Sequence, residues 1–254
     1  MKLIIPDWTA PPNIAALVTT RSGGESLPPY DDGQGGGGLN LAMHVGDDAG
    51  RVMRNRALLR ELLPAEPSWL SQIHGTSVVD AAQTFDAASY GTIEADASFA
   101  TEAGVVCAIM TADCLPVIFC DQAGSIVAAA HAGWRGLANG VLENTVSCLR
   151  DKGAVEILAW LGPAIGPLQF EVGEDVRSVF VQRDARAEAA FNAFTGRPGK
   201  YLADIYQLAR LVLAKAGVRQ IFGGGLCTVS DPGQFYSYRR DHSTGRFASL
   251  VWLK

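Results

Sequence analysis

Three short apolar runs in the middle of the chain most narrowly limit the folds open to it. They cover residues 105–110, 116–120 and 125–130, and each has the length and composition of a strand. Asp121-Gln-Ala-Gly124 predicts a turn between the last two runs. We therefore expect three neighbouring strands in this part of the chain.

Helical periodicity begins soon after these runs. Apolar residues recur at helical spacing from Leu137 onward, and Lys152-Gly153 supplies a basic last turn and a stop. A second helix is predicted to begin at Asp204, which suits the N-cap position, and to end at Gly217. Helices are thus expected between the strands.

Further strands complete the pattern. One is expected at residues 156–161, and a terminal hairpin is expected from strands at 234–238 and 246–253. Strands interleaved with helices and hairpins indicate mixed β-sheets flanked by helices, an α/β (α+β) sandwich. A length of 254 residues with 48% hydrophobic content suits a single domain over residues 1–254, with a mobile glycine-rich surface loop at 31–38.

Composition excludes several classes of partner. The net charge is −5 and the basic residues are scattered, which gives no electrostatic footprint for nucleic acid. No segment approaches the roughly 18 apolar residues of a membrane span, and the first apolar run is too short for a signal peptide. The five cysteines include no C-x-x-C pair and predict no disulfide framework. We expect a cytoplasmic protein, monomeric or homodimeric, that acts on a small molecule.

A cysteine and a histidine lie where apolar runs give way to small residues. Cys114 follows the first run, and His131 follows the third. With His74, in Gln72-Ile-His-Gly75, they offer two imidazoles and one thiolate, the ligand set of a zinc site with an open fourth position. Their spacing matches no zinc-finger pattern, so such a site must be assembled from separate loops. The same residues allow a metal-free alternative, with Cys114 as nucleophile and His131 as its base, and the sequence leaves both open.

Other charged and aromatic residues suit an anionic, flat substrate. Guanidinium groups beside glycine-rich backbone suit phosphate or carboxylate binding, and the candidates are Arg21, Arg135, Arg239, Arg240 and Arg246. The carboxylates that could move protons are Asp96, Asp113 and Glu171. Trp134 and Phe170 could stack on a flat base.

Motifs over nearly the whole chain resemble those of one known family. They lie at residues 20–24, 40–47, 72–75, 95–97, 112–116, 131–136, 162–167, 170–173, 227–228 and 237–240. In these motifs the chain is similar to the YfiH or laccase-domain proteins, variously described as polyphenol oxidases, peptidoglycan editing factors and purine nucleoside phosphorylases. The resemblance implies mixed sheets with helices outside and metal ligands at His74, Cys114 and His131. It also adds His44 to the candidate substrate-binding residues.

By this resemblance the expected activity is purine nucleoside chemistry. It implies phosphorolysis of adenosine, inosine, guanosine or methylthioadenosine to base and ribose 1-phosphate, with zinc-dependent deamination of adenosine as a companion reaction. The expected partners are a nucleoside and phosphate, and the expected metal is Zn²⁺.

Three alternatives accompany this expectation. A copper polyphenol oxidase is disfavoured, although Cu²⁺ could bind, because the chain's 4 histidines are too few for several copper centres. A Cys114–His131 hydrolase or amidase could edit a peptidoglycan precursor. A non-catalytic metal-binding or nucleotide-binding regulator is the third alternative.

Overall fold

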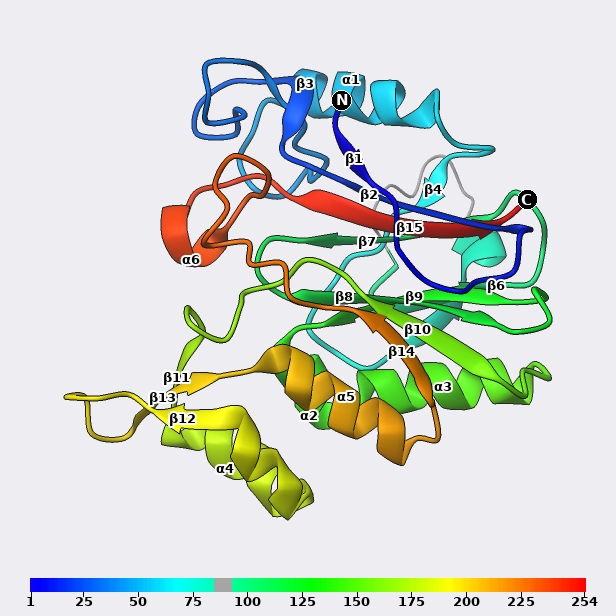
Figure 1. Ribbon diagram of the computed structural model, residues 1–254. Helices are drawn as coiled ribbons and strands as arrows, with labels where there is room; N and C mark the ends of the chain where they lie inside the picture. Colours follow the sequence, from blue (N-terminus) through cyan, green and yellow to red (C-terminus); the bar gives the residue numbers. More distant parts are fainter. Residues whose placement is uncertain (85–92) are drawn as a thin grey trace.

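The computed structural model shows two stacked β-sheets with helices on both outer faces (Figure 1). It describes residues 1–84 and 93–254, and within them one sheet has five strands and the other six. In spatial order the first sheet contains β1 (Leu3–Ile4), β2 (Ile14–Thr19), β15 (Phe247–Leu253), β7 (Val106–Thr111) and β4 (Pro67–Ser68). The second contains β14 (Gln220–Gly223), β10 (Ile157–Leu161), β8 (Leu115–Asp121), β9 (Val127–Ala132), β6 (Ala97–Ala100) and β5 (Val78–Asp80).

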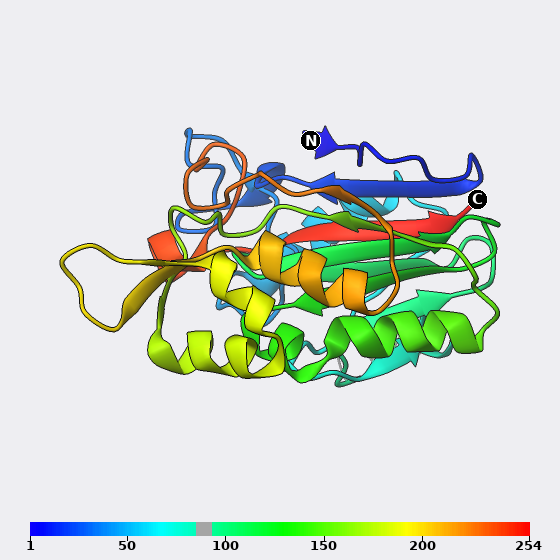
Figure 2. The same cartoon turned by 60° about the horizontal axis from the view of Figure 1, so that its bottom comes forward.

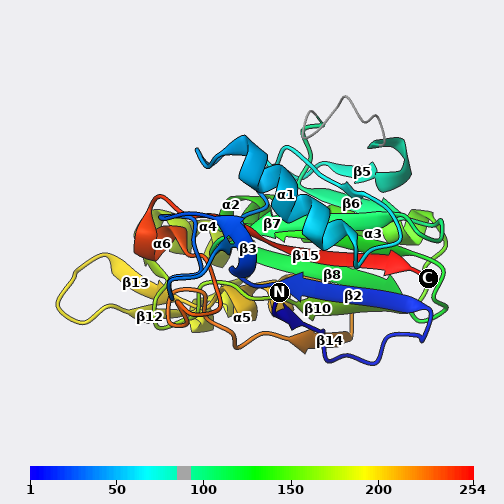
Figure 3. The ribbon, with the colours of Figure 1, turned by 90° about the horizontal axis from the view of Figure 1, so that it is seen from above.

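Helices cover the outer face of each sheet. Helix α1 (Ala49–Arg60) crosses the first sheet, next to the short strand β3 (Ser22–Ser26) (Figure 3). Helices α2 (Trp134–Asn139), α3 (Val141–Asp151) and α5 (Ile205–Lys215) cover the second (Figure 2). Beside them lie a small sheet of β11 (Glu171–Gly173), β13 (Lys200–Ala203) and β12 (Phe191–Ala193), helix α4 (Glu174–Arg183) and the 3-10 turn η2 (Ala185–Ala190). A second 3-10 turn, η1 (Ala81–Thr84), follows β5.

The central core lies between the two sheets. Side chains alternate along each strand, so Ile109 of β7 and Val251 of β15 meet Ile118 of β8 and Ala129 of β9 there. The intervening residues of the second sheet pack against α3 and α5 instead. The structure confirms mixed sheets flanked by helices in a single domain.

The prediction of three neighbouring strands is correct only for β8 and β9. These two pair antiparallel, from Leu115 opposite Ala132 to Cys120 opposite Val127. Strand β7 instead pairs with β15 and β4 in the other sheet. The short link through Asp113, at φ 91°, carries the chain from one sheet to the other, so β7 and β8 do not pair.

The predicted terminal hairpin is wrong. Helix α6 (Tyr238–Asp241) begins within the first predicted strand, and the Ser237 hydroxyl caps it by accepting from the backbone N–H of Arg240. Strand β15 lies between β2 and β7 and pairs antiparallel with both. Its partners are distant in sequence, so local periodicity could not identify them.

The predicted helices are largely found. The helix expected from Leu137 is two helices, α2 and α3, because Gly140 lies between them at φ 106°. Helix α5 begins after Asp204, as predicted, and the Asp204 carboxylate accepts from the backbone N–H of Gln207 at 3.0 Å. Strand β10 agrees with the strand expected at 156–161.

The glycine-rich segment 31–38 is a surface loop, and its mobility stays a prediction. Asp32 accepts hydrogen bonds from the backbone N–H groups of Gln34 and Gly36. The amide of Asn55 donates to the carbonyl of Gly38. A Cβ at position 38 would collide with the Tyr30 carbonyl oxygen, so packing requires glycine there.

Within the described part of the chain, none of the helices has the length and apolar character needed to cross a membrane.

We predict that Asp204→Ala lowers the free energy of unfolding by about 1 kcal/mol, because it removes the α5 N-cap. Asp204→Asn should retain most of the stability, since an amide oxygen can also cap. Urea denaturation measures the free energy of unfolding of both variants, and the slope of that free energy against urea concentration should stay unchanged. An alanine variant as stable as the wild type would contradict the prediction.

Candidate active site

Three potential metal ligands from separate parts of the fold meet at one edge of the stacked sheets. His74 lies in the loop before β5, Cys114 in the link between β7 and β8, and His131 on β9. The Cys114 Sγ and His74 Nε2 are 3.7 Å apart, and the ligand atoms of all three lie within 4.8 Å of one another. Among the described residues, this is the only group of its kind.

Their arrangement fits a tetrahedral metal ion with three protein ligands. Zn–S and Zn–N bond lengths imply ligand atoms about 3.3–3.8 Å apart, and the 3.7 Å separation of Cys114 and His74 falls in that range. Gly133 keeps the space beside them open, since a Cβ there would lie 3.0 Å from both the Cys114 Sγ and the His74 Cδ2. The donor set therefore suits Zn²⁺ or Cu²⁺ with an open position.

Buried Asp96 orients both histidines. Its Oδ1 is 2.7 Å from the His131 Nδ1 and accepts from the backbone N–H of His74 at 2.9 Å. Its Oδ2 accepts from the N–H of Gly75 at 2.6 Å, which helps to hold His74 at φ 61°. An Nδ1–H bound to Asp96 leaves the His131 Nε2 free to bind a metal. Burial opposes ionisation of Asp96, but the hydrogen bonds from His131 and Gly75 hold its pKa below the usual range.

Electrostatics in this group favour a thiolate. Burial opposes ionisation of Cys114, but the neighbouring imidazoles of His131 and His74 lower the pKa of its thiol to about 6. Burial likewise opposes protonation of His131, but Cys114 and Asp96 raise its pKa to about 9. By contrast, burial raises the pKa of the core thiols Cys107 and Cys120 to about 12. Cys114 thus has the ionisation state that a metal ligand or a nucleophile needs.

The three ligands open onto a cavity of about 460 Å³. Its cationic lining residues are Arg135, Arg239 and Arg246. Its aromatic and apolar lining residues are Met110, Trp134, Ile165, Phe170, Ile205 and Tyr238. A cavity of this size with cationic and aromatic lining residues suits a flat, polar small molecule with an anion beside it.

The arginines differ in how firmly they are held. The Arg135 guanidinium stacks over the Trp134 ring at 4.5 Å and has no hydrogen-bond partner among the described residues. Arg239 lies 5.8 Å from the Phe170 ring centre and donates to the carbonyl of Glu171. Burial lowers the pKa of Arg246, while the negative charges of Cys114 and Asp113 oppose that change.

Most residues predicted for the site reach this cavity. Beyond the three ligands, those that line it are His44, Asp113, Trp134, Arg135, Phe170, Arg239 and Arg246. Asp113, which the sequence predicts as a catalytic acid or base, lines the cavity, but both of its carboxylate oxygens accept hydrogen bonds from the fold. The donors are the Thr228 hydroxyl and the backbone N–H of Arg239, each at 2.6 Å.

Besides Asp96, which bonds to His131, three predicted residues do not line the cavity. Arg21 is buried elsewhere, where its guanidinium donates to the carbonyls of Asp31 and Pro232. Arg240 donates to the carbonyls of Thr228 and Phe235 and pairs with Asp241. Glu171 pairs with Arg197. Their polar groups have partners within the fold and are not directed at the metal group.

Sequence reasoning missed two functional neighbours. Gln72 hydrogen-bonds through its side chain to both the N–H and the carbonyl of Met110, which fixes the segment before His74 to β7. Tyr238 lines the cavity from α6, an element that the sequence did not predict. Both lie in motifs that carry the family resemblance, at 72–75 and 237–240, but the position of each depends on partners distant in the chain.

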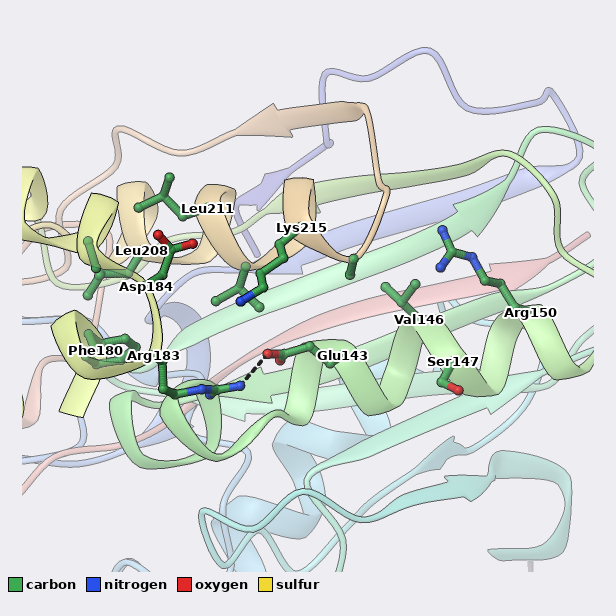
Figure 4. Close-up of a pocket in the computed structure, with 13 residues that line it drawn as sticks. Glu143, Val146, Ser147, Arg150, Phe180, Arg183, Asp184, Leu208, Leu211 and Lys215 are labelled. Carbon is green, nitrogen blue, oxygen red and sulfur yellow. Dashed lines mark hydrogen bonds and ion pairs between the residues drawn. The ribbon is translucent and has the colours of Figure 1, made fainter.

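A second cavity, of about 330 Å³, lies between α3 and α5 (Figure 4). Its apolar floor includes Val146 and Leu208, and Glu143 at its rim pairs with Arg183 at 2.8 Å. Its described lining contains neither histidine nor cysteine. We therefore place the candidate chemistry in the cavity that His74, Cys114 and His131 line.

Residues 15–254 match the family model described as multi-copper polyphenol oxidoreductase laccase. Two similar relatives are both named purine nucleoside phosphorylase. YfiH of Escherichia coli (strain K12) is 54% identical over 254 residues, covering 99% of each chain. PA4543 of Pseudomonas aeruginosa is 54% identical over 251 residues, covering 99% of this chain and 98% of its own.

Solved structures show the same fold. The crystal structure of Neisseria meningitidis protein NMB0706 has a TM-score of 0.90 at 47% identity and covers 100% of both chains. That of the Bacillus licheniformis hypothetical protein YfiH has a TM-score of 0.84 at 31% identity, covering 95% of this chain and 93% of its own.

We predict that Asp96→Asn weakens zinc affinity about 10–100-fold, because the amide cannot accept every hydrogen bond that orients His131 and His74. Asp121→Asn is the matched control, since Asp121 is a buried carboxylate bonded to backbone N–H groups at the opposite end of β8. Competition with a chromogenic chelator measures both. Equal losses in the two variants would contradict the role given to Asp96.

Proposed function

Since the chain belongs to the multi-copper polyphenol oxidoreductase laccase family, whose relatives described above are named purine nucleoside phosphorylases, we propose that it is a zinc-dependent enzyme of purine nucleosides. Its proposed reaction is phosphorolysis of adenosine, inosine, guanosine or methylthioadenosine to the free base and ribose 1-phosphate. The proposed partners are the nucleoside and inorganic phosphate, and the proposed location is the cytoplasm.

One observation carries this proposal: the His74–Cys114–His131 group opens onto a cavity that is lined by both arginines and aromatic side chains. Guanidinium groups suit phosphate, and aromatic side chains suit a purine. The cavity volume of about 460 Å³ lies in the range of small-molecule sites.

The metal proposed here is a single zinc ion held by His74, Cys114 and His131. When bound, zinc would supply Lewis-acid chemistry toward an oxygen atom or a water molecule. The described residues offer one such ligand group, and the whole chain has 4 histidines, which supports one metal ion and not several coppers.

The chain's own residues supply binding and orientation. Arg135, Arg239 and Arg246 would hold phosphate, while Trp134 and Phe170 would hold the base. As the bond from C1′ to the base breaks, its electron pair leaves with the base and C1′ gains positive charge. A phosphate oxygen then bonds to C1′, and the proton of hydrogen phosphate passes to the base. Fixed cations that keep the phosphate close to C1′ would favour this step.

Adenosine deamination is the proposed companion reaction. It needs a group that carries a proton between water and the base. Asp113 is the only carboxylate among the described lining residues, and both its oxygens already accept hydrogen bonds. Deamination should therefore be slower than phosphorolysis.

We predict that adenosine yields adenine only when phosphate is present, with inosine as a slower product. Cys114→Ala should lower kcat/KM more than about 100-fold and remove the zinc, because it deletes a metal ligand. Cys148→Ala, which changes a half-buried cysteine on α3, is the matched control and should leave both unchanged. Chromatography of the products and elemental analysis of one sample check this. Full activity and metal content in Cys114→Ala would refute the assignment.

A hydrolase is the second candidate, and the chain of contacts from Cys114 through His131 to Asp96 favours it. It places a nucleophile, a base and an orienting carboxylate in sequence, with the thiol pKa lowered to about 6. Such an enzyme could act as an amidase on a cell-wall precursor.

We expect chelation to decide between the two candidates. The zinc enzyme should lose nucleoside turnover on chelator treatment and regain it with added zinc. The hydrolase should keep its activity in chelator but lose it on thiol alkylation, which is fast at pH 7 because Cys114 is then largely thiolate. Retained nucleoside turnover in chelator would contradict zinc dependence.

A further inference from the structure

Asp113 occupies an unusual position beside the metal ligand Cys114. It lies at φ 91°, a left-handed conformation that aspartate tolerates better than most residues, in the link that joins the two sheets. Its side chain is buried although it carries a charge. A buried carboxylate is costly unless its oxygens have partners, so its hydrogen bonds indicate its role.

Both carboxylate oxygens bind groups from distant segments. Oδ1 accepts from the Thr228 hydroxyl at 2.6 Å, and Oδ2 accepts from the backbone N–H of Arg239 at 2.6 Å. The backbone carbonyl of Asp113 accepts from the N–H of Ile165 at 2.9 Å. Charge-assisted bonds this short are among the stronger ones in proteins. Asp113 therefore joins three segments to the link that contains Cys114.

Two of these segments contribute directly to the cavity. Ile165 lines it from the loop after β10, and Arg239 lines it from α6. Thr228 also holds the loop that contains Ile165, because the backbone N–H of Thr228 donates to the carbonyl of Ala164 at 3.0 Å. It also braces α6, because Arg240 donates to the Thr228 carbonyl at 2.8 Å.

We infer that Asp113 is a positioning residue that fixes Arg239 relative to the metal ligand Cys114, and so sets where phosphate binds. It adjoins Cys114 in the chain and holds the backbone of Arg239 through space. This role replaces the proton-carrying one expected from the sequence, and it rests on the proposed phosphorolysis. A carboxylate whose two oxygens are both engaged by the fold holds groups in place.

Two substitutions at position 113 separate positioning from proton transfer. Asp113→Asn can still accept from the Arg239 N–H through its amide oxygen and donate to the Thr228 hydroxyl. Asp113→Gly removes the side chain yet suits the positive φ. Both remove the negative charge, so a difference between them reports on the hydrogen bonds.

Thr228→Val is a milder test that leaves the carboxylate in place. Its matched control is Thr145→Val, since Thr145 is a buried threonine of α3 whose hydroxyl donates to the Val141 carbonyl away from the cavity. This pair keeps the inference testable even if Asp113→Gly does not fold.

The test measures kcat, the KM for phosphate, the dissociation constant for phosphate by calorimetry, and the zinc content. The four variants are Asp113→Asn, Asp113→Gly, Thr228→Val and Thr145→Val. Asp113→Gly should raise the KM and the dissociation constant for phosphate about tenfold or more. Thr228→Val should raise both constants about threefold. Losses of this size are expected when a buried hydrogen bond that orients a ligand-binding group is removed. Thr145→Val should stay within about twofold of the wild type, and Asp113→Asn, which keeps the hydrogen bonds without the charge, should lose less phosphate binding than Asp113→Gly. Zinc content should remain that of the wild type throughout.

Equal loss of kcat in Asp113→Asn and Asp113→Gly, with unchanged phosphate binding, would identify a proton carrier and overturn the inference. A Thr228→Val variant identical to Thr145→Val in phosphate binding would also overturn it. Failure of the proposed function looks different, because the wild-type protein itself would then neither bind phosphate nor release base. That result would remove the phosphate site and this inference with it.

Discussion

The candidate site depends most on one buried carboxylate, that of Asp96. It accepts from the backbone at residues 73–75 and bonds to the His131 ring, so a single group just before β6 holds both the backbone of His74 and the ring of His131. A buried charge with this many donors is stable because its lost hydration is replaced by fixed hydrogen bonds. Removing it would leave unpaired donors and free the His131 ring to adopt another tautomer.

A second buried carboxylate organises the other half of the cavity. Asp96 controls the imidazoles, whereas Asp113 connects the Cys114 link to Thr228 and Arg239. The candidate metal ligands and the candidate phosphate-binding residue Arg239 are therefore each held by a buried carboxylate of the sandwich. Sites supported this way keep their geometry before a ligand arrives, which reduces the cost of binding.

Local pattern predicted β8, β9, β10 and α5 well, because each has a run of apolar residues with its own periodicity and a clear end signal. It failed at the terminal hairpin and at the sheet assignment of β7. Strand pairing depends on segments far apart in the chain, because β15 pairs with β2 and β7. Helix α1, with four arginines among its twelve residues, has little apolar periodicity and was not predicted.

By itself, the sequence determined the ligand types: it contains His74, Cys114 and His131 next to small residues, and few other groups could bind a transition metal. It also determined the mixed sandwich, since strands and helices alternate along it. Only the tertiary structure decided which charged residues reach the cavity. Arg21, Arg240 and Glu171 are bound elsewhere within the fold, whereas Arg135, Arg239 and Arg246 line the cavity. A guanidinium has the same chemistry in every sequence context, so its role depends on where the folded chain places it.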